Sequence, residues 1–560
     1  MNWKKIFLAS IAVITLFGCD TGAPQVENSD GGVTKGEFAS SRKESGENGD
    51  ANEQKKQQLQ DGDIPHLIVE TIRRLEEEGN ENAALYKELT YNYISLSETE
   101  KQKFSELSAA LESLNSKVDE GIDEKDKGLE DYIVRSEAEG TKEYRFVSSE
   151  TKDYVFRADS RAVSILRCNY LSDTGESGDI GYTSFNFDTA TGRSLKLNDV
   201  VADTDLFFEK LGDIITLEYG EEYEAALIDY KDREEKGEFS DLVWTVSQEG
   251  VCVYFAPKTL SEDISGEIIV NLYFDDMEKL FNSKYKQSLK DYFIPLLENR
   301  GLELDGNGDG VREKVNLEQS DSALNVMVGD KLINDLYSYE TEAYAVKKNG
   351  KYYLYMFTLQ DNDYVILEVI DLMTMEYNED ASESLKPVLV SRSALSEKVN
   401  YYSEKRAAFV DTDLFLGERY LNILSTYSGV RNYKVGDDGR PKASDYYTVM
   451  GNQIIQANSD IICEEVSSSG EVKSQAKISE GAYLMLIRTD GESVVDVKIL
   501  DPENVKVSES EFSTDISTDI TNEVEEYETL YRLNIDMEEW PGKINGVDVE
   551  ELFTGMHYAG

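Results

Sequence analysis

The spacing of apolar residues changes near Tyr144, and this change is the feature that most constrains the fold. Between about Ile64 and Leu129, apolar residues recur every three or four positions, as on one face of a helix. Beyond Tyr144 they alternate with polar residues, which is the period of a half-buried strand. Helices followed by strands predict an α+β fold. In it, N-terminal helices pack with an antiparallel sheet, and a strand-rich C-terminal region follows.

Two stretches upstream of Tyr144 carry the helical spacing. The first consists of Leu85, Leu89 and Tyr93. The second is an apolar face spaced by three and four, made of Phe104, Leu107, Leu111, Leu114 and Val118. Gly121 and Gly128 interrupt this pattern, and a coiled coil would need at least three sustained heptads. We therefore expect two or three helices in residues 63–140.

Five segments in the middle of the chain alternate in the manner of strands. They are residues 162–171, 183–187, 194–197, 251–255 and 267–274. Residues 188–192 read Asp-Thr-Ala-Thr-Gly, a composition typical of turns, whereas residues 206–219 have helical spacing. Residues 141–295 are accordingly predicted to form an α+β domain.

Residues 296–560 are rich in strand and turn signals. Asn349-Gly350 lies between two alternating segments and predicts a hairpin with a type I′ turn. Asp490-Gly491 predicts a second hairpin. Helices are expected at Phe409–Thr426 and Val549–Phe553. We expect a β-rich α+β region here, of one or two domains.

Charge is the most lopsided property of the composition. The 560 residues include 111 Asp and Glu against 57 Lys and Arg, a formal net charge of −54. Such a field repels nucleic acid and anionic lipid and attracts cations and basic proteins. Solubility is the simpler reason for an acidic composition. Nucleic acid is therefore not expected as a partner.

Histidine and cysteine are scarce. The two histidines, His66 and His557, disfavour Ser-His-Asp and Cys-His mechanisms and His-rich zinc sites. Pairs of carboxylates arise by chance among 111 acids, so a glycosidase dyad is not inferred. Cys168 and Cys252 lie in strand-like runs, where either a disulfide or two reduced core thiols would fit. Cys463 adds an odd thiol.

The N-terminal segment predicts the location. Lys4 and Lys5 precede an uncharged, mostly apolar run from Ile6 to Phe17, followed by Gly18-Cys19. This pattern is typical of a secretory signal and is too short to span a membrane. The end of the run also resembles the lipobox of bacterial lipoproteins, which implies cleavage before Cys19 and lipid on its thiol. The alternative is an ordinary signal peptide with a chance cysteine.

After the signal peptide of residues 1–18, the segment 19–62 is polar and rich in Gly, Ser, Asn, Glu and Lys. It has too little apolar surface to form a core, so we expect Cys19 followed by a disordered tether. This tether would hold the rest of the chain roughly 35–40 Å from its anchor.

Several segments between residues 85 and 290 resemble a domain family of largely unknown function. They are Phe104–Asn115, Ala158–Ser164, Phe185–Val200, Trp244–Val246 and Gly250–Pro257. The family occurs in the extracytoplasmic part of lysozyme-sensing anti-sigma factors and as an accessory domain of peptidoglycan deacetylases. The resemblance implies a domain that can bind lysozyme. The chain differs from the family at Ser177–Gly181 and at Pro257-Lys258.

One loop has the spacing of a calcium site. Oxygen ligands occur at alternating positions, with a glycine where the chain must turn, in the series Asp305, Asn307, Asp309, Val311 (carbonyl) and Glu313. Asn316 replaces the bidentate acid of an EF-hand, so the loop resembles the calcium turns of secreted β-rich repeats. The alternative is a solvated turn, because Asp and Gly dominate turns in any case. No other cofactor is expected.

These features predict a lipid-anchored extracytoplasmic binding protein of the bacterial cell envelope, without catalytic activity. Its expected ligand is a cell-wall component or a basic protein such as lysozyme. A cell-wall or glycan hydrolase with an unrecognised carboxylate site is the alternative. Tyr352-Tyr353 could stack on sugar rings, but aromatic residues on strands more often pack in the core.

Overall fold

The computed structural model describes most of the chain after residue 58. The described residues are 59–558, apart from 81–82, 138–143, 174–175, 234–241, 287–288, 298–299, 321, 362–364, 378–382, 385–389, 396–398, 445, 510–513 and 519–528. The predicted signal peptide, Cys19 and nearly all of the tether lie outside them. Within the described ranges, no helix has the length and apolar character needed to cross a membrane.

The fold is mostly β, and this corrects the predicted arrangement of N-terminal helices on a sheet. Strands β1 (Leu67–Asn80) and β2 (Ala83–Leu96) form a long antiparallel pair where helices were expected. A spacing of four, as in Leu85, Leu89 and Tyr93, fits a period of two as well as a period of 3.6. The local pattern therefore could not separate strand from helix.

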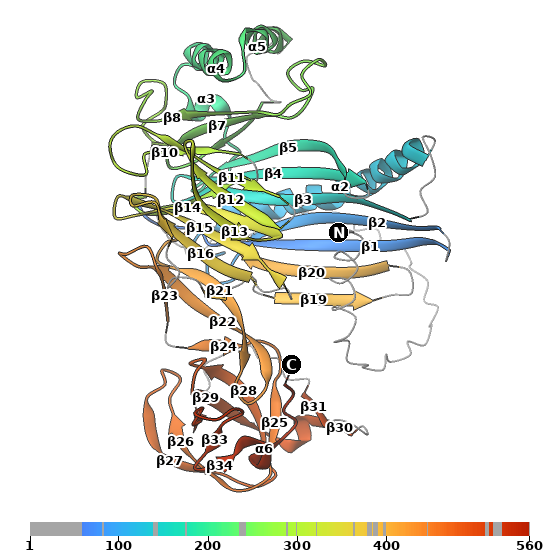
Figure 1. The fold of residues 1–560 in the computed structure, drawn as a ribbon, viewed down its shortest axis with the longest axis vertical. Helices are drawn as coiled ribbons and strands as arrows, with labels where there is room; N and C mark the ends of the chain where they lie inside the picture. The colour runs from blue at the N-terminus through green and yellow to red at the C-terminus, as the bar shows by residue number, and fades with distance from the viewer. Residues whose placement is uncertain are drawn as a thin grey trace, which may run out of the picture. The chain divides into compact units, whose positions relative to one another are not determined.

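The first sheet joins segments that are far apart in the sequence (Figure 1). Its strand order is β19-β20-β1-β2-β3-β4-β5. The further members are β3 (Tyr144–Ala158), β4 (Ala162–Asp173), β5 (Glu176–Asp188), β19 (Val390–Leu395) and β20 (Val399–Ala407). Strands β2 and β3 are parallel, and parallel neighbours need a long crossover connection. Helix α2 (Ser105–Glu137) lies in that connection.

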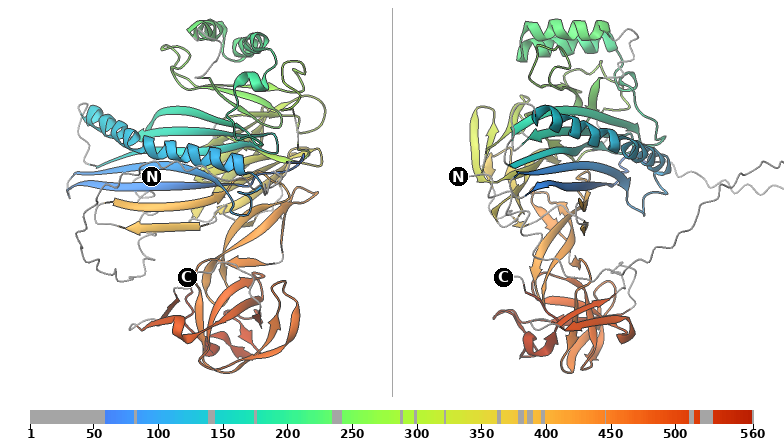
Figure 2. Two further views of the ribbon diagram at one scale, coloured as in Figure 1. Left: turned by 180° about the vertical axis from the view of Figure 1, so that it is seen from behind. Right: turned by 90° about the vertical axis from the view of Figure 1, so that its right-hand side faces the viewer.

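Helix α2 lies across one face of the first sheet (Figure 2). Four of the five residues of the predicted apolar face are buried in one cluster with residues of β3 and β4, namely Phe104, Leu107, Leu111 and Leu114, whereas Val118 is only partly buried. Gly121 and Gly128 lie inside a single helix of 33 residues, which replaces the two or three helices expected.

A smaller layer follows in the chain. It contains α3 (Leu197–Val200), α4 (Thr204–Glu218), α5 (Glu221–Arg233) and the sheet β6-β7-β8 (Val243–Val246, Gly250–Phe255, Ile268–Tyr273). The helix predicted at residues 206–219 is confirmed as α4. Cys168, Cys252 and Cys463 are free and buried, which matches the alternative of reduced core thiols.

Two further sheets share a core with β4 and β7. One runs β17-β16-β15-β14-β9 with β18 beside β16, and the other runs β10-β11-β12-β13. Their strands are β9 (Tyr292–Leu296), β10 (Leu302–Leu304), β11 (Glu313–Gln319), β12 (Ala323–Val328), β13 (Lys331–Tyr337), β14 (Glu340–Lys348), β15 (Lys351–Leu359), β16 (Val365–Asp371), β17 (Glu376–Tyr377) and β18 (Glu383–Ser384). The predicted type I′ hairpin is confirmed, since Asn349 and Gly350 have φ of 52° and 79° between β14 and β15.

The last sheet runs β21-β22-β24-β28-β29-β32-β26-β27, with β23, β25 and β35 at its margins. Its bounds are β21 (Phe415–Asn422), β22 (Thr426–Val435), β23 (Pro441–Ala443), β24 (Tyr447–Val449), β25 (Ile454–Ala457), β26 (Ile461–Val466), β27 (Val472–Ile478), β28 (Tyr483–Thr489), β29 (Val494–Leu500), β32 (Leu530–Asn534) and β35 (Phe553–Thr554). Small ribbons add β30 (Val505–Glu509) with β31 (Thr514–Thr518), and β33 (Lys543–Ile544) with β34 (Val547–Asp548), before α6 (Val549–Leu552).

The helix predicted at Phe409–Thr426 is wrong, because β21 pairs there with β22. Phe409 and Phe415 instead enter an aromatic cluster around Phe293, at ring distances of 5.6 and 6.0 Å. These partners lie more than a hundred residues away, where local spacing gives no signal. The hairpin around Asp490-Gly491 and the C-terminal helix are confirmed as β28–β29 and α6.

Candidate functional site

Three of the segments that carry the family resemblance, residues 158–164, 185–200 and 244–246, meet in a buried polar network. Arg157 and Asp159 are both fully buried at the end of β3, and the Arg157 Nε lies 2.7 Å from the Asp159 Oδ2. The Gln248 side chain donates to the same oxygen at 2.6 Å, and the backbone of Arg161 donates to the Asp159 Oδ1 at 2.8 Å. Burial lowers the pKa of the Arg157 guanidinium, and the adjacent Asp159 opposes that effect.

A second part of the network joins β4, β5 and β6. The Ser164 hydroxyl donates to the Asn186 Oδ1 at 2.6 Å and accepts from the Val246 backbone at 2.9 Å. The Asn186 amide donates to the Trp244 carbonyl at 2.8 Å. All four residues are buried. Because these motif residues hydrogen-bond one another away from solvent, they hold two sheets together and do not present a ligand surface.

The positions at which the chain differs from the family lie elsewhere. Residues Ser177–Gly181 form part of β5 and pair with β4, and so do not form a separate loop. Lys258 has φ of 64° and its backbone donates to the Ile264 carbonyl at 2.7 Å.

The predicted calcium loop connects β10 to β11. Its side chains cap the loop's own backbone: Gly310 N–H donates to the Asp305 Oδ2 at 3.0 Å, Asp309 N–H to the Asn307 Oδ1 at 2.9 Å, and Val311 N–H to the Asp309 Oδ1 at 2.8 Å. Gly310 has φ of 86°, which a residue with a Cβ rarely adopts. These contacts turn the loop as the alternating spacing requires.

Two oxygens of this loop are buried and have no hydrogen-bond partner: the Asp305 Oδ1 and the Glu313 Oε2. A buried carboxylate oxygen without a donor is costly, and a bound cation would remove that cost. The other Glu313 oxygen accepts from the Asn307 amide at 2.7 Å. Asp309 is exposed, and among the described residues no three or more His, Cys, Asp or Glu side chains already lie close enough together to hold a metal. The calcium site therefore stays a prediction.

Arg312 anchors the calcium loop to the sheet β6-β7-β8. Its guanidinium lies 2.6 Å from the Asp276 carboxylate and 4.2 Å from the centroid of the Tyr273 ring. The Tyr273 hydroxyl accepts from the Glu303 backbone at 3.3 Å. The loop is thus fastened at both ends to the body of the protein.

His66 stands out in the sequence only for its rarity. In the structure its side chain bridges two carboxylates. Its Nδ1 lies 2.8 Å from the Glu100 carboxylate and its Nε2 lies 3.2 Å from the Asp411 carboxylate. Hydrogen bonds to Asp411 and Glu100 raise the pKa of His66 to about 9, against the effect of burial. Nothing local in the sequence identifies Asp411 as a partner.

Lys125 on α2 has the opposite environment. Its ammonium donates to three neutral oxygens: Thr90 O at 2.8 Å, Thr151 Oγ1 at 2.5 Å and Asn169 Oδ1 at 3.4 Å. Burial, reinforced by the charge of Arg167, lowers the pKa of Lys125 to about 8.

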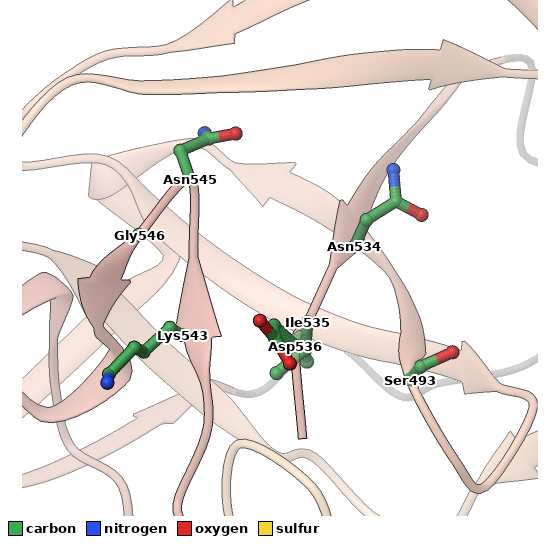
Figure 3. A pocket seen from close by; sticks show the side chains of 7 residues that line it. All are labelled: Ser493, Asn534, Ile535, Asp536, Lys543, Asn545 and Gly546. Atoms are coloured by element: carbon green, nitrogen blue, oxygen red, sulfur yellow. The ribbon is translucent and has the colours of Figure 1, made fainter. Parts of the chain in front are cut away.

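An open pocket of about 410 Å³ lies in the C-terminal sheet region (Figure 3). Its lining mixes uncharged polar, charged and apolar residues, and consists of Ser493, Asn534, Ile535, Asp536, Lys543, Asn545 and Gly546. No sequence motif predicts this pocket, since its residues come from three separate segments of the chain.

Two solved structures of the DUF3298 family, a domain of unknown function, are similar to part of the chain. One, from Bacteroides fragilis, is 16% identical over 40% of this chain and 96% of its own, with a TM-score of 0.26. The other, from Pseudomonas aeruginosa, is 12% identical over 41% and 99%, with a TM-score of 0.24. Such low scores carry no argument about the site. No family model and no curated protein matches the sequence.

Proposed function

We propose that the protein is a non-catalytic, lipid-anchored binding protein of the bacterial cell envelope, with a structural calcium ion at residues 305–313. The observation that carries the location is the basic, then apolar N-terminal segment that ends in Gly18-Cys19. The polar segment to residue 62 would then separate the anchor from the folded body.

The calcium part of the proposal is supported by the two buried oxygens of Asp305 and Glu313 that lack a donor. Asn307, Asp309 and the Val311 carbonyl would complete the set of oxygen ligands that calcium prefers. When bound, the ion would supply positive charge that holds these oxygens together. Its role would be to stabilise the β10–β11 turn.

The ligand is proposed to be a cell-wall component or a basic protein such as lysozyme. The net charge of −54 supports attraction of a basic partner, which falls with salt because the screening length is only about 8 Å at physiological ionic strength. Titration with lysozyme and with another basic protein of similar charge separates recognition from charge. Specific recognition requires tighter binding to lysozyme at about 0.3 M salt. Equal affinities that vanish together would remove lysozyme as the partner.

The anchoring is tested by Cys19→Ser. We expect loss of lipid label and release from the membrane fraction, with His557→Gln as a control that keeps the leader intact. Unchanged fractionation and label in the Cys19 variant would refute lipid attachment.

A further inference from the structure

Trp540 is an exposed tryptophan in the loop between β32 and β33. Its side chain is 62% exposed, whereas Trp244 is 4% exposed and buried beside the polar network. Tyr352 and Tyr353, the aromatic pair considered from the sequence, are buried in the core. An exposed aromatic ring gains free energy when a ligand covers its apolar surface.

Tyr558 holds this indole in place. The two ring centroids are 5.0 Å apart at an interplanar angle of 66°, an edge contact. The Tyr558 hydroxyl lies 3.7 Å from the Met556 sulfur. Burial, with the nearby Glu550 carboxylate, raises the pKa of Tyr558 to about 12, so the phenol stays neutral at physiological pH. The pair therefore presents a fixed, uncharged aromatic surface.

The two ends of the loop that carries Trp540, Asp536 and Lys543, line the pocket of Figure 3, whereas Trp540 itself lies outside the lining. Asp536 and Lys543 close this loop through two backbone hydrogen bonds of 2.8 and 2.9 Å. Both residues line the pocket, together with Asn534 and Asn545. The aromatic surface of Trp540 thus belongs to the loop whose ends line a cavity with two amide side chains.

Beside Asp536 and Lys543, the pocket offers uncharged side chains that can hydrogen-bond hydroxyl groups. The Asn534 amide donates to Glu464 at 3.3 Å and the Asn545 amide to the Ile462 carbonyl at 2.9 Å, which leaves their amide oxygens as acceptors. The remaining amide hydrogens add donors, and the Ser493 hydroxyl, which donates to the Asp490 carboxylate at 3.2 Å, adds an acceptor. A sugar ring needs donors and acceptors together, and its C–H face packs on an aromatic ring.

Charge narrows the class of sugar. Glu538 and Glu539 flank Trp540 in the sequence, and Asp548 and Glu550 raise the pKa of Tyr558. These carboxylates repel an anionic glycan. The pocket lining contains one carboxylate, Asp536, and one ammonium, Lys543, which pairs with Glu539 at 2.8 Å, so the lining itself has no net charge to attract an ionic group.

We propose that Trp540 and the adjoining pocket bind a pyranose unit of an uncharged glycan. This inference deepens the proposed binding function by naming the ligand class and its site. It rests on the proposed function only for the location, the cell envelope, where the protein would encounter glycan.

The test uses the soluble Cys19→Ser chain after removal of the leader, so that Trp244 and Trp540 are its two tryptophans. The probe is a tetramer of N-acetylglucosamine. Its binding is measured by calorimetry and by the quenching of Trp540 fluorescence with acrylamide. We expect the sugar to protect the exposed indole. Trp540→Ala should bind at least tenfold more weakly, and Asn534→Ala several-fold more weakly. Tyr420→Ala is the matched control, since Tyr420 is also 62% exposed but lies on β21.

Several results would overturn the proposal. One is that millimolar sugar does not protect Trp540 from acrylamide. Another is that Trp540→Ala binds the sugar as tightly as the parent, with an unchanged Trp244 signal. A third is that Tyr420→Ala loses as much sugar affinity as Trp540→Ala. Protection by polylysine but not by the sugar would assign the site to a basic partner instead. Equal binding of polygalacturonate would refute the restriction to uncharged glycans. Because the test needs no membrane, a negative result would refute the glycan site without bearing on the proposed lipid anchor.

Discussion

The network around Asp159 and the loop around Asp305 are both polar, and both stood out in the sequence, but they differ in how their oxygens are used. Arg157, Gln248 and two backbone amides donate to the Asp159 carboxylate. In the loop, one oxygen each of Asp305 and Glu313 is buried without a donor. A distinctive polar motif can therefore be part of a buried hydrogen-bonded network that stabilises the fold. A motif with the spacing of metal ligands can instead leave buried oxygens without a hydrogen-bond donor.

The largest effect is expected from breaking the network. Asp159→Ala leaves the buried Arg157 charge without its partner, and removal of one member of a buried pair costs about 3–5 kcal/mol in the free energy of unfolding. The urea transition followed by Trp244 fluorescence measures this loss. Asp213→Ala, on the exposed face of α4, should leave the transition unchanged. A shift below about 1 kcal/mol in the Asp159 variant would show that the network is not a support.

Calcium should act on the other region. A ligand that binds only the folded state stabilises it by about 2.7 kcal/mol at a hundredfold excess over Kd. Millimolar calcium should raise the melting temperature, and Asp305→Ala with Asp309→Ala should remove the increment. Asp330→Asn, in an exposed turn of the same sheet, should keep it. A melting curve of the unaltered protein that ignores calcium would refute the site.

His66 extends the comparison to a charge with two carboxylate partners. Its folded pKa of about 9 lies above the unfolded value of 6.5, so its contribution is fully present below pH 6.5 and is lost as the pH rises through 9. At pH 7, His66→Gln should cost about 1–2 kcal/mol after allowance for partial exposure.

The difference between the His66 variant and the parent should vanish above about pH 10. Burial alone would raise the pKa of Glu100, but its bonds to His66 lower it, so acid should also weaken the bridge as the pH falls through the folded pKa. His557→Gln is the control. A pH-independent difference would show that the His66 charge plays no part.

Lys125 should show the smallest effect and the opposite sign. Its folded pKa of about 8 lies below the unfolded value of 10.5, so the charged form carries a penalty below pH 8 that is relieved as the pH rises to 10.5. In Lys125→Met, lost hydrogen bonds and removed desolvation offset each other, within about 1 kcal/mol at pH 7. Urea titrations at pH 7 and 10 should show that the free energy of unfolding rises less with pH in Lys125→Met than in the parent protein. An unchanged gain would contradict the burial of this charge.

Features with a local cause were predictable from the sequence. The turn at Asn349-Gly350 was found because both residues accept a positive φ. The apolar face of α2 from Phe104 to Leu114 was found because its spacing fits a long helix. The pocket beside Trp540 was missed, since its lining comes from turns without any shared motif.

The sequence by itself determined the leader pattern, the charge, the local turns and the spacing of the Asp305–Glu313 loop, because each depends on neighbouring residues. The tertiary structure decided the class of the fold and the role of the polar motifs. Strand β1 pairs with β20, and His66 reaches Asp411 across 345 residues. Pairing over such distances depends on partners that a local pattern does not contain, so only the folded chain shows that β1 and β2 are strands and that Asp159 is buried.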